Sequence, residues 1–177
     1  LKSHISIPIN MKLSPSFSSV GNMVQRLAES GADGVALFNR FYQPDIDVEG
    51  MRLKFALTPT VSSDALLAMR WMAMLHGRVE CSLSATGGVH TGDDAIKLLL
   101  AGSDVVHLCH ALLQHGPEHL QRVIADVRDW MERQGFEQID DFRGRMSQVS
   151  LGQVIPQRPQ EQCEGRRAVG CGSPIQR

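Results

Sequence analysis

The sequence predicts an α/β fold, and the architecture that fits it best is the C-terminal half of a (β/α)8 TIM barrel. Apolar strand-like segments alternate with amphipathic helical segments up to about residue 148, which is typical of a parallel sheet with crossover helices. One αβ joint also occurs twice, at residues 29–38 and 100–109, where a helix end leads through glycine and aspartate into an apolar strand. A doubly wound sheet uses similar joints, so the repeated joint alone leaves both architectures open.

Four βα units follow one another along the chain. The strand-like segments are residues 7–12, 34–38, a weak one at 53–57, 79–84 and 104–109. Ser18 or Ser19 is expected to cap a first helix that ends at Gly31. Further helices are expected at residues 64–75, at 93–101 and from Pro117 to Gly135, where the last one carries Leu120, Val123, Val127 and Trp130 on one face.

The most informative junction is a glycine-rich loop between a strand and a capped helix, residues 86–95. Gly87 and Gly88 allow close approach of the backbone to a ligand, and Thr91 with Asp94 has the spacing of a capping box. Unpaired N–H groups at such a helix start suit a phosphate, although a Gly-Gly turn commonly serves only the backbone. TIM barrels usually carry their phosphate loops after the last two strands, and the two candidate loops here follow the last two strands. This position indicates the C-terminal half of a barrel.

Composition and charge exclude several classes of protein. The 177 residues carry a formal charge of −1 with a pI near 6.7, so a nucleic-acid partner is not expected. No apolar run approaches the roughly 18 residues of a membrane span. The four cysteines lack a framework spacing and indicate reduced thiols in the cytoplasm, with Cys81 and Cys109 buried in strands. Four histidines between residues 107 and 119 lack the carboxylate or cysteine spacing that would complete a metal site, so no metal is expected.

Several motifs resemble the class 1 dihydroorotate dehydrogenase family, most closely its bacterial dihydroorotate dehydrogenase-like branch. The likeness covers about residues 6–148 and matches the C-terminal half of those enzymes. Its five separated motifs occur in the family's order, at residues 11–15, 37–41, 85–104, 111–117 and 134–144. The resemblance implies an FMN-containing TIM barrel that oxidises dihydroorotate to orotate in pyrimidine biosynthesis.

The resemblance also implies roles for nine residues. The cofactor-binding set comprises Lys12 at the flavin ring, Phe38, the phosphate-binding backbone of Gly87 and Gly88, and a second phosphate loop at Cys109, His110 and Ala111. The resemblance places Asn39 and Arg40 among the substrate-binding residues. From the sequence alone, Lys12 also fits a strand-end lysine that reaches solvent, and Asn39 fits an Asx turn equally well. Arg40 either pairs with a carboxylate or indicates a different substrate.

The chain departs from the family pattern in three places. Arg40 follows Asn39 where the family has a small hydroxyl residue, and Leu57-Thr58-Pro59-Thr60 stands where the family has glycines. Cys109-His110 replaces a small residue and serine, so His110 either adds a donor or obstructs the phosphate. The family's proton-abstracting Cys or Ser is expected before Leu1, so no catalytic base is assigned. These departures indicate a fragment whose partners are a small-molecule substrate and the missing N-terminal half of the barrel, with a homodimer possible when complete.

The C-terminal tail differs in composition from the rest of the chain. Residues 149–177 are rich in Gln, Arg, Pro and Gly and lose apolar periodicity, so they are expected to be disordered or aberrant and to carry no site. The domain is therefore expected to span residues 1–148. The alternative function is a non-catalytic or differently employed barrel half that binds a phosphate ligand.

Overall fold

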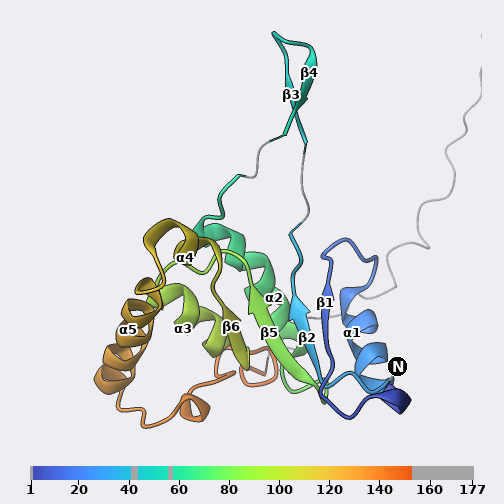
Figure 1. Cartoon of the computed structure of the whole chain (residues 1–177). Coiled ribbons are helices and arrows are strands. Elements are labelled where there is room, and N and C mark those ends of the chain that lie inside the picture. The colour runs from blue at the N-terminus through green and yellow to red at the C-terminus, as the bar shows by residue number, and fades with distance from the viewer. Residues whose placement is uncertain (1, 41–43, 56–57, 153–177) are drawn as a thin grey trace, which may run out of the picture.

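The computed structural model describes residues 2–40, 44–55 and 58–152 and centres on a four-stranded parallel sheet (Figure 1). Its strand order is β1-β2-β5-β6, with β1 at Asn10–Leu13, β2 at Gly34–Leu37, β5 at Ser82–Thr86 and β6 at Val105–His107. Every neighbouring pair is parallel. This arrangement confirms the predicted α/β class with a parallel sheet.

Helices follow the strands and cover the sheet. They are α1 at Val20–Glu29, α2 at Ala65–Leu75, α3 at Gly92–Ala101, the short α4 at His110–His115 and α5 at His119–Gln134. Short 3-10 turns lie at Lys2–His4, Ser62–Asp64 and Ile139–Asp141. The central strand β2 is buried along its whole length, as expected for an interior parallel strand, and Val24, Met72 and Leu98 from three helices pack into the same core.

The edge strands differ from the central ones. Most residues of β1 and β6 are exposed or half-buried, and neither strand has an outer partner strand within the described residues. In a parallel sheet an unpaired edge leaves backbone N–H and C=O groups available to another strand. The sheet is therefore open on both sides.

The strand expected at residues 53–57 is not part of this sheet, and that prediction is wrong. Its first residues form β4 (Arg52–Lys54), which pairs antiparallel with β3 (Asp45–Asp47) in a hairpin that stands apart from the sheet (Figure 1). The Arg52 Nε donates to the Asp47 carboxylate at 2.9 Å across the turn. Ile46 is 65% and Leu53 56% exposed, so this local pairing forms without any apolar layer to draw it into the core. Residues 56 and 57 lie outside the described residues.

Other predicted boundaries shift by a few residues. The first strand begins at Asn10 rather than at residue 7, and the strand expected at 79–84 runs from Ser82 to Thr86. Cys109 is exposed rather than buried, because β6 already ends at His107 and the unpredicted α4 follows. Consequently the last helix begins at His119, not at Pro117. Ser19 occupies the N-cap position of α1, but its side chain makes no capping hydrogen bond.

The residues after α5 close the base of the fold. Phe142 is fully buried and packs its ring against those of Trp130 and Phe136. The backbone N–H groups of the next residues donate hydrogen bonds to carbonyl oxygens near the ends of α3 and α2. Gly144 N–H donates to Leu99 O at 3.0 Å, Met146 N–H to Leu100 O at 2.9 Å and Gln148 N–H to Ala73 O at 2.9 Å. These bonds support a folded unit that extends to about residue 148. The predicted character of the tail stays a prediction, because residues 153–177 lie outside the described residues.

Candidate functional site

A cavity of about 420 Å³ lies where the carboxyl ends of the four parallel strands meet. Each strand contributes to it, because parallel strands end at the same edge of a sheet and ligands bind there in open and closed α/β folds. Its lining residues are Lys12, Phe38, Asn39, Arg40, Thr58, Pro59, Thr60, Thr86, Gly87, Gly88, Val89, Cys109, His110 and Leu113.

The cavity brings together all but one of the residues that the sequence singled out. Lys12 comes from β1, Phe38 to Arg40 follow β2, Gly87 and Gly88 follow β5, and Cys109 and His110 follow β6. Ala111 is fully buried and does not line the cavity. Residues from positions 12 to 110 therefore share one concave surface.

The β1–β2 side of the cavity carries a lysine and an arginine. Lys12 and Arg40 are both exposed, while Phe38, directly after β2, is only 8% exposed and forms an apolar wall. The Asn39 N–H donates to Leu13 O at 2.6 Å, which holds the end of β2 beside the end of β1. The Asn39 side chain is thereby left at the cavity, where its amide offers both a donor and an acceptor.

The glycine loop on the β5 side depends on left-handed backbone. Gly87 and Gly88 have φ values of 97° and 74°, a region that L side chains rarely adopt. A Cβ on Gly87 would meet nothing within 4 Å, whereas a Cβ on Gly88 would overlap the backbone amide of Ala65 at the start of α2. Gly87 thus leaves space beside the cavity, and Gly88 lets the loop pack against α2.

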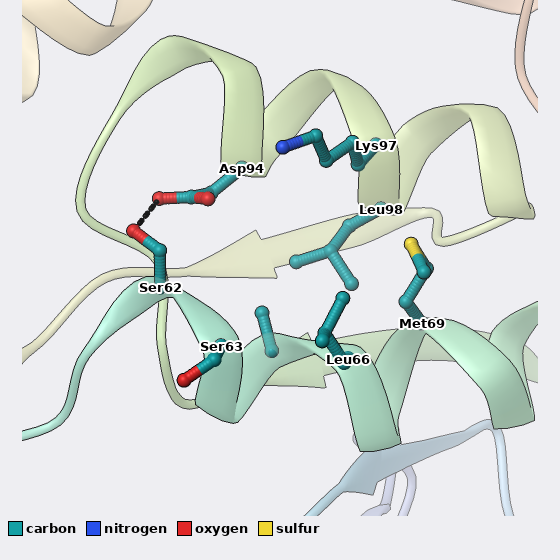
Figure 2. A pocket seen from close by; sticks show the side chains of 8 residues that line it. Ser62, Ser63, Leu66, Met69, Asp94, Lys97 and Leu98 are labelled. Carbon is teal, nitrogen blue, oxygen red and sulfur yellow. Dashed lines mark hydrogen bonds between the residues drawn. The ribbon is translucent and has the colours of Figure 1, made fainter.

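Asp94 fixes the far end of this loop. Its buried Oδ2 accepts hydrogen bonds from Ser62 Oγ at 2.8 Å, His90 N at 3.1 Å, and Thr91 N and Oγ1 at 3.0 Å each. Thr91 Oγ1 in turn accepts from Asp94 N at 3.3 Å, which confirms the predicted capping box. Figure 2 shows Asp94 and Ser62 pointing toward one another from the starts of two helices.

The ionisation of Asp94 follows from these contacts. Burial alone raises the pKa of this carboxyl, but the hydrogen bonds from Ser62, His90 and Thr91 outweigh it and hold the pKa below its usual 3.8. Asp94 is therefore ionised at neutral pH and joins the start of α2, the glycine loop and α3.

One histidine, His110, lines the β6 side of the cavity and is packed against a second histidine behind it. The ring of His110 lies edge-on to that of His90, with centroids 6.0 Å apart. His90 Nε2 lies 2.9 Å from Thr60 Oγ1, and its backbone oxygen accepts a hydrogen bond from His119 Nε2 at 2.7 Å. The sequence did not single out Thr60 as a site residue; its one signal was its place in the segment that replaces the family's glycines.

The charge of the cavity favours an anionic ligand. Lys12, Arg40 and His110 line it, and no aspartate or glutamate is among its described lining residues. Within residues 2–40, 44–55 and 58–152 no three His, Cys, Asp or Glu side chains gather as a metal cluster. None of the helices in these ranges has the length and apolar character needed to cross a membrane.

The comparison with protein families decides the assignment. The sequence pattern of the dihydroorotate dehydrogenase family matches residues 1–131. This chain belongs to the dihydroorotate dehydrogenase family. Proteins of this family are FMN-dependent oxidoreductases.

Individual relatives point to the same family. The chain is 25% identical over 178 aligned positions to the chloroplastic dihydropyrimidine dehydrogenase (NADP(+)) of Arabidopsis thaliana, covering 92% of this chain and 42% of that protein. It is 28% identical to the catalytic subunit of dihydroorotate dehydrogenase B (NAD(+)) of Pelobacter propionicus, covering 78% and 46%. The chain thus spans about half the length of the curated relatives it matches.

A solved structure shows the same fold. The dihydroorotate dehydrogenase of Eimeria tenella, crystallised with ferulenol, superposes with a TM-score of 0.59 at 20% identity over 76% of this chain and 37% of that one. The match covers a part of a barrel chain. The four-stranded parallel sheet is therefore a partial barrel of the dihydroorotate dehydrogenase type.

Proposed function

We propose that this chain forms the phosphate-binding half of an FMN site and, within a complete barrel, part of an oxidoreductase that acts on a dihydropyrimidine. The observation that carries the proposal is the cavity at the carboxyl ends of all four strands. It combines an open glycine loop, a lysine and an arginine, and its described lining residues include no carboxylate. Its volume lies in the range of small-molecule sites.

The cavity fits FMN on the evidence of its own residues. The Gly87-Gly88 backbone offers close approach for a phosphate, and Lys12 would lie beside the electron-rich edge of the flavin ring. Phe38 would form an apolar wall against the ring, and the loop at Cys109 to Ala111 would close the phosphate end. When bound, FMN supplies the hydride acceptor, and the protein supplies orientation and electrostatics.

The substrate end of the proposed site favours an acidic dihydropyrimidine. Asn39 presents both hydrogen-bonding groups of an amide, which match the ring amide edges of a pyrimidine. Arg40 presents a guanidinium, which pairs with a carboxylate through two parallel hydrogen bonds. Dihydroorotate carries such a carboxylate, so it is the first candidate substrate. A neutral dihydropyrimidine is the second candidate, favoured by the similarity to a dihydropyrimidine dehydrogenase.

A complementary half-barrel is the partner we propose for the open sheet. Besides the free edges of β1 and β6, an apolar groove of about 620 Å³ lies along β6 and α5 and includes Val105, Leu120 and Ile124. Eight parallel strands close a barrel of this type, and the described part of this chain supplies four of them. Further βα units beside β6 would cover the groove.

The test measures flavin retention. The product of the complete open reading frame that contains these residues is purified, and flavin absorbance is read after gel filtration. The wild type is expected to retain FMN, and Gly87→Asp to lose it, because a side chain at Gly87 has open space beside the cavity and the new carboxylate adds bulk and negative charge there. Lys12→Ala is expected to retain FMN but to be reduced more slowly by dihydroorotate, whereas Lys97→Ala on α3 serves as a matched lysine control outside the cavity lining.

Two results would count against the proposal. A folded wild type that binds no FMN would remove the cofactor assignment, and stoichiometric FMN in a folded Gly87→Asp protein would remove the glycine loop from it. Comparing reduction by dihydroorotate and by dihydrouracil, in wild type and Arg40→Ala, separates the two substrate candidates. If the substrate is acidic, Arg40→Ala slows flavin reduction by dihydroorotate more than flavin reduction by dihydrouracil.

A further inference from the structure

We infer that the imidazole of His110 binds the phosphate of the flavin nucleotide and makes this chain select FMN over riboflavin. The inference rests on the proposed function and deepens it. It concerns a side chain of this sequence, which supplies a donor at the end of the cavity away from Lys12 and Arg40.

The strand order separates the cavity's positive groups from its imidazole. Lys12 and Arg40, the positive groups, come from β1 and from the end of β2, whereas the imidazole of His110 follows β6 at the opposite edge of the sheet. Gly87 and Gly88 follow β5, which is the direct neighbour of β6. His110 is thus the one side chain with a nitrogen donor among the described lining residues on the glycine-loop side of the cavity.

The neighbours of His110 hold its ring while leaving its nitrogens available. The His90 ring packs edge-on against it, and His90 is itself held by Thr60 at 2.9 Å and by His119 at 2.7 Å. Within the described residues neither ring nitrogen of His110 makes a hydrogen bond to another side chain or to the backbone. A positioned and unused N–H at a half-buried cavity wall is suited to donate to an anion.

The chemistry of the ligand then determines what His110 contributes. A phosphomonoester presents several charged acceptor oxygens, and a hydrogen bond to a charged acceptor is stronger than one between neutral groups. Riboflavin has the same ring system and ribityl chain but ends in a hydroxyl. A contact made only to the phosphate therefore affects FMN binding and leaves riboflavin binding unchanged.

The experiment compares the two flavins directly. Dissociation constants of FMN and riboflavin are measured by quenching of flavin fluorescence at pH 7 for wild type, His110→Ala and His110→Asn, with the full protein in each case. We expect His110→Ala to weaken FMN about tenfold or more, the scale of one hydrogen bond to a charged group, and to change riboflavin less than twofold. His110→Asn keeps a donor on a shorter side chain, so its dissociation constant for FMN is expected to lie between those of wild type and His110→Ala. It replaces the alanine variant if that variant does not fold.

A matched control and three outcomes complete the test. His107→Asn changes an exposed histidine of β6 outside the cavity lining and is expected to leave both constants unchanged. An unchanged ratio of FMN to riboflavin affinity in both His110 variants overturns the inference while the proposed function stands. Tighter FMN binding in His110→Ala also overturns it, because the imidazole then obstructs the site. Absence of both flavins from folded wild type overturns the proposed function itself.

Discussion

Asp94 offers the sharpest test of how the glycine loop is held. Asp94→Asn keeps the size of the side chain and removes its charge. One carboxylate oxygen accepts four hydrogen bonds, from Ser62, His90 and two atoms of Thr91. In the variant each hydrogen bond has a neutral acceptor in place of a charged one, which weakens it by roughly 1 kcal/mol. The single amide oxygen of Asn can also accept only about two of the four hydrogen bonds. Partial recovery through water leaves an expected loss of about 2–3 kcal/mol in the free energy of unfolding.

Urea denaturation followed by circular dichroism measures this loss. For an m-value of about 1–3 kcal/mol/M, the midpoint is expected to fall by roughly 0.7–3 M at pH 7. Asp93→Asn is the matched control, because Asp93 is exposed in the same first turn of α3; its change is expected to stay within about 0.5 kcal/mol.

The pH dependence gives the same prediction a sign. Because the folded-state pKa of Asp94 lies below its usual 3.8, its stabilising contribution is complete above that pH and is lost as the pH falls through the folded-state value. The difference between wild type and Asp94→Asn is therefore expected to be constant from pH 5 to 8 and to shrink below about pH 4. Equal urea midpoints for the two proteins at pH 7 would refute the reasoning.

Three further predictions concern the loop, the base of the fold and the sheet edges. Gly88→Ala is expected to destabilise by more than Gly87→Ala, because both need left-handed backbone but only Gly88 has no room for a Cβ; thermal unfolding of both variants checks the order. Phe142→Ala is expected to cost about 3–5 kcal/mol and to change the fluorescence of Trp130, which equilibrium unfolding with tryptophan emission detects. The isolated chain is expected to associate with rising concentration through β1 and β6, and a concentration-independent monomer in sedimentation velocity would contradict this.

Local chemistry explains which elements could be predicted from the sequence. Thr91 and Asp94 lie three residues apart and cap α3 through their own side chains, so their pattern suffices without the rest of the fold. The apolar run at β2 likewise predicts a buried central strand. The sequence also predicted that Lys12, Asn39, Gly87 and His110 share one cavity, because the carboxyl ends of parallel strands lie at one edge of the sheet.

Long-range pairing explains the rest. The residues of β4 pair with β3 rather than with the sheet, and a three-residue strand carries too little apolar surface to reveal that choice. Cys109 was expected inside a strand because apolar character alone does not mark where β6 gives way to the six-residue α4. The contact between Thr60 and His90 joins segments that are 30 residues apart in the sequence, so no local sequence pattern predicts it.

The path of the chain after α5 determines where a label or tether can be attached to this protein. The hydrogen bonds from Gly144, Met146 and Gln148 fasten residues 144–148 to the ends of α3 and α2, and Figure 1 shows this segment at the end of the sheet away from α4 and the carboxyl ends of the strands. A fluorophore, an affinity handle or a surface tether joined after residue 152 is thereby carried on the face opposite the cavity. Immobilised protein then presents its cavity to solution, so candidate ligands can be tested for binding in real time without the attachment point shielding the cavity.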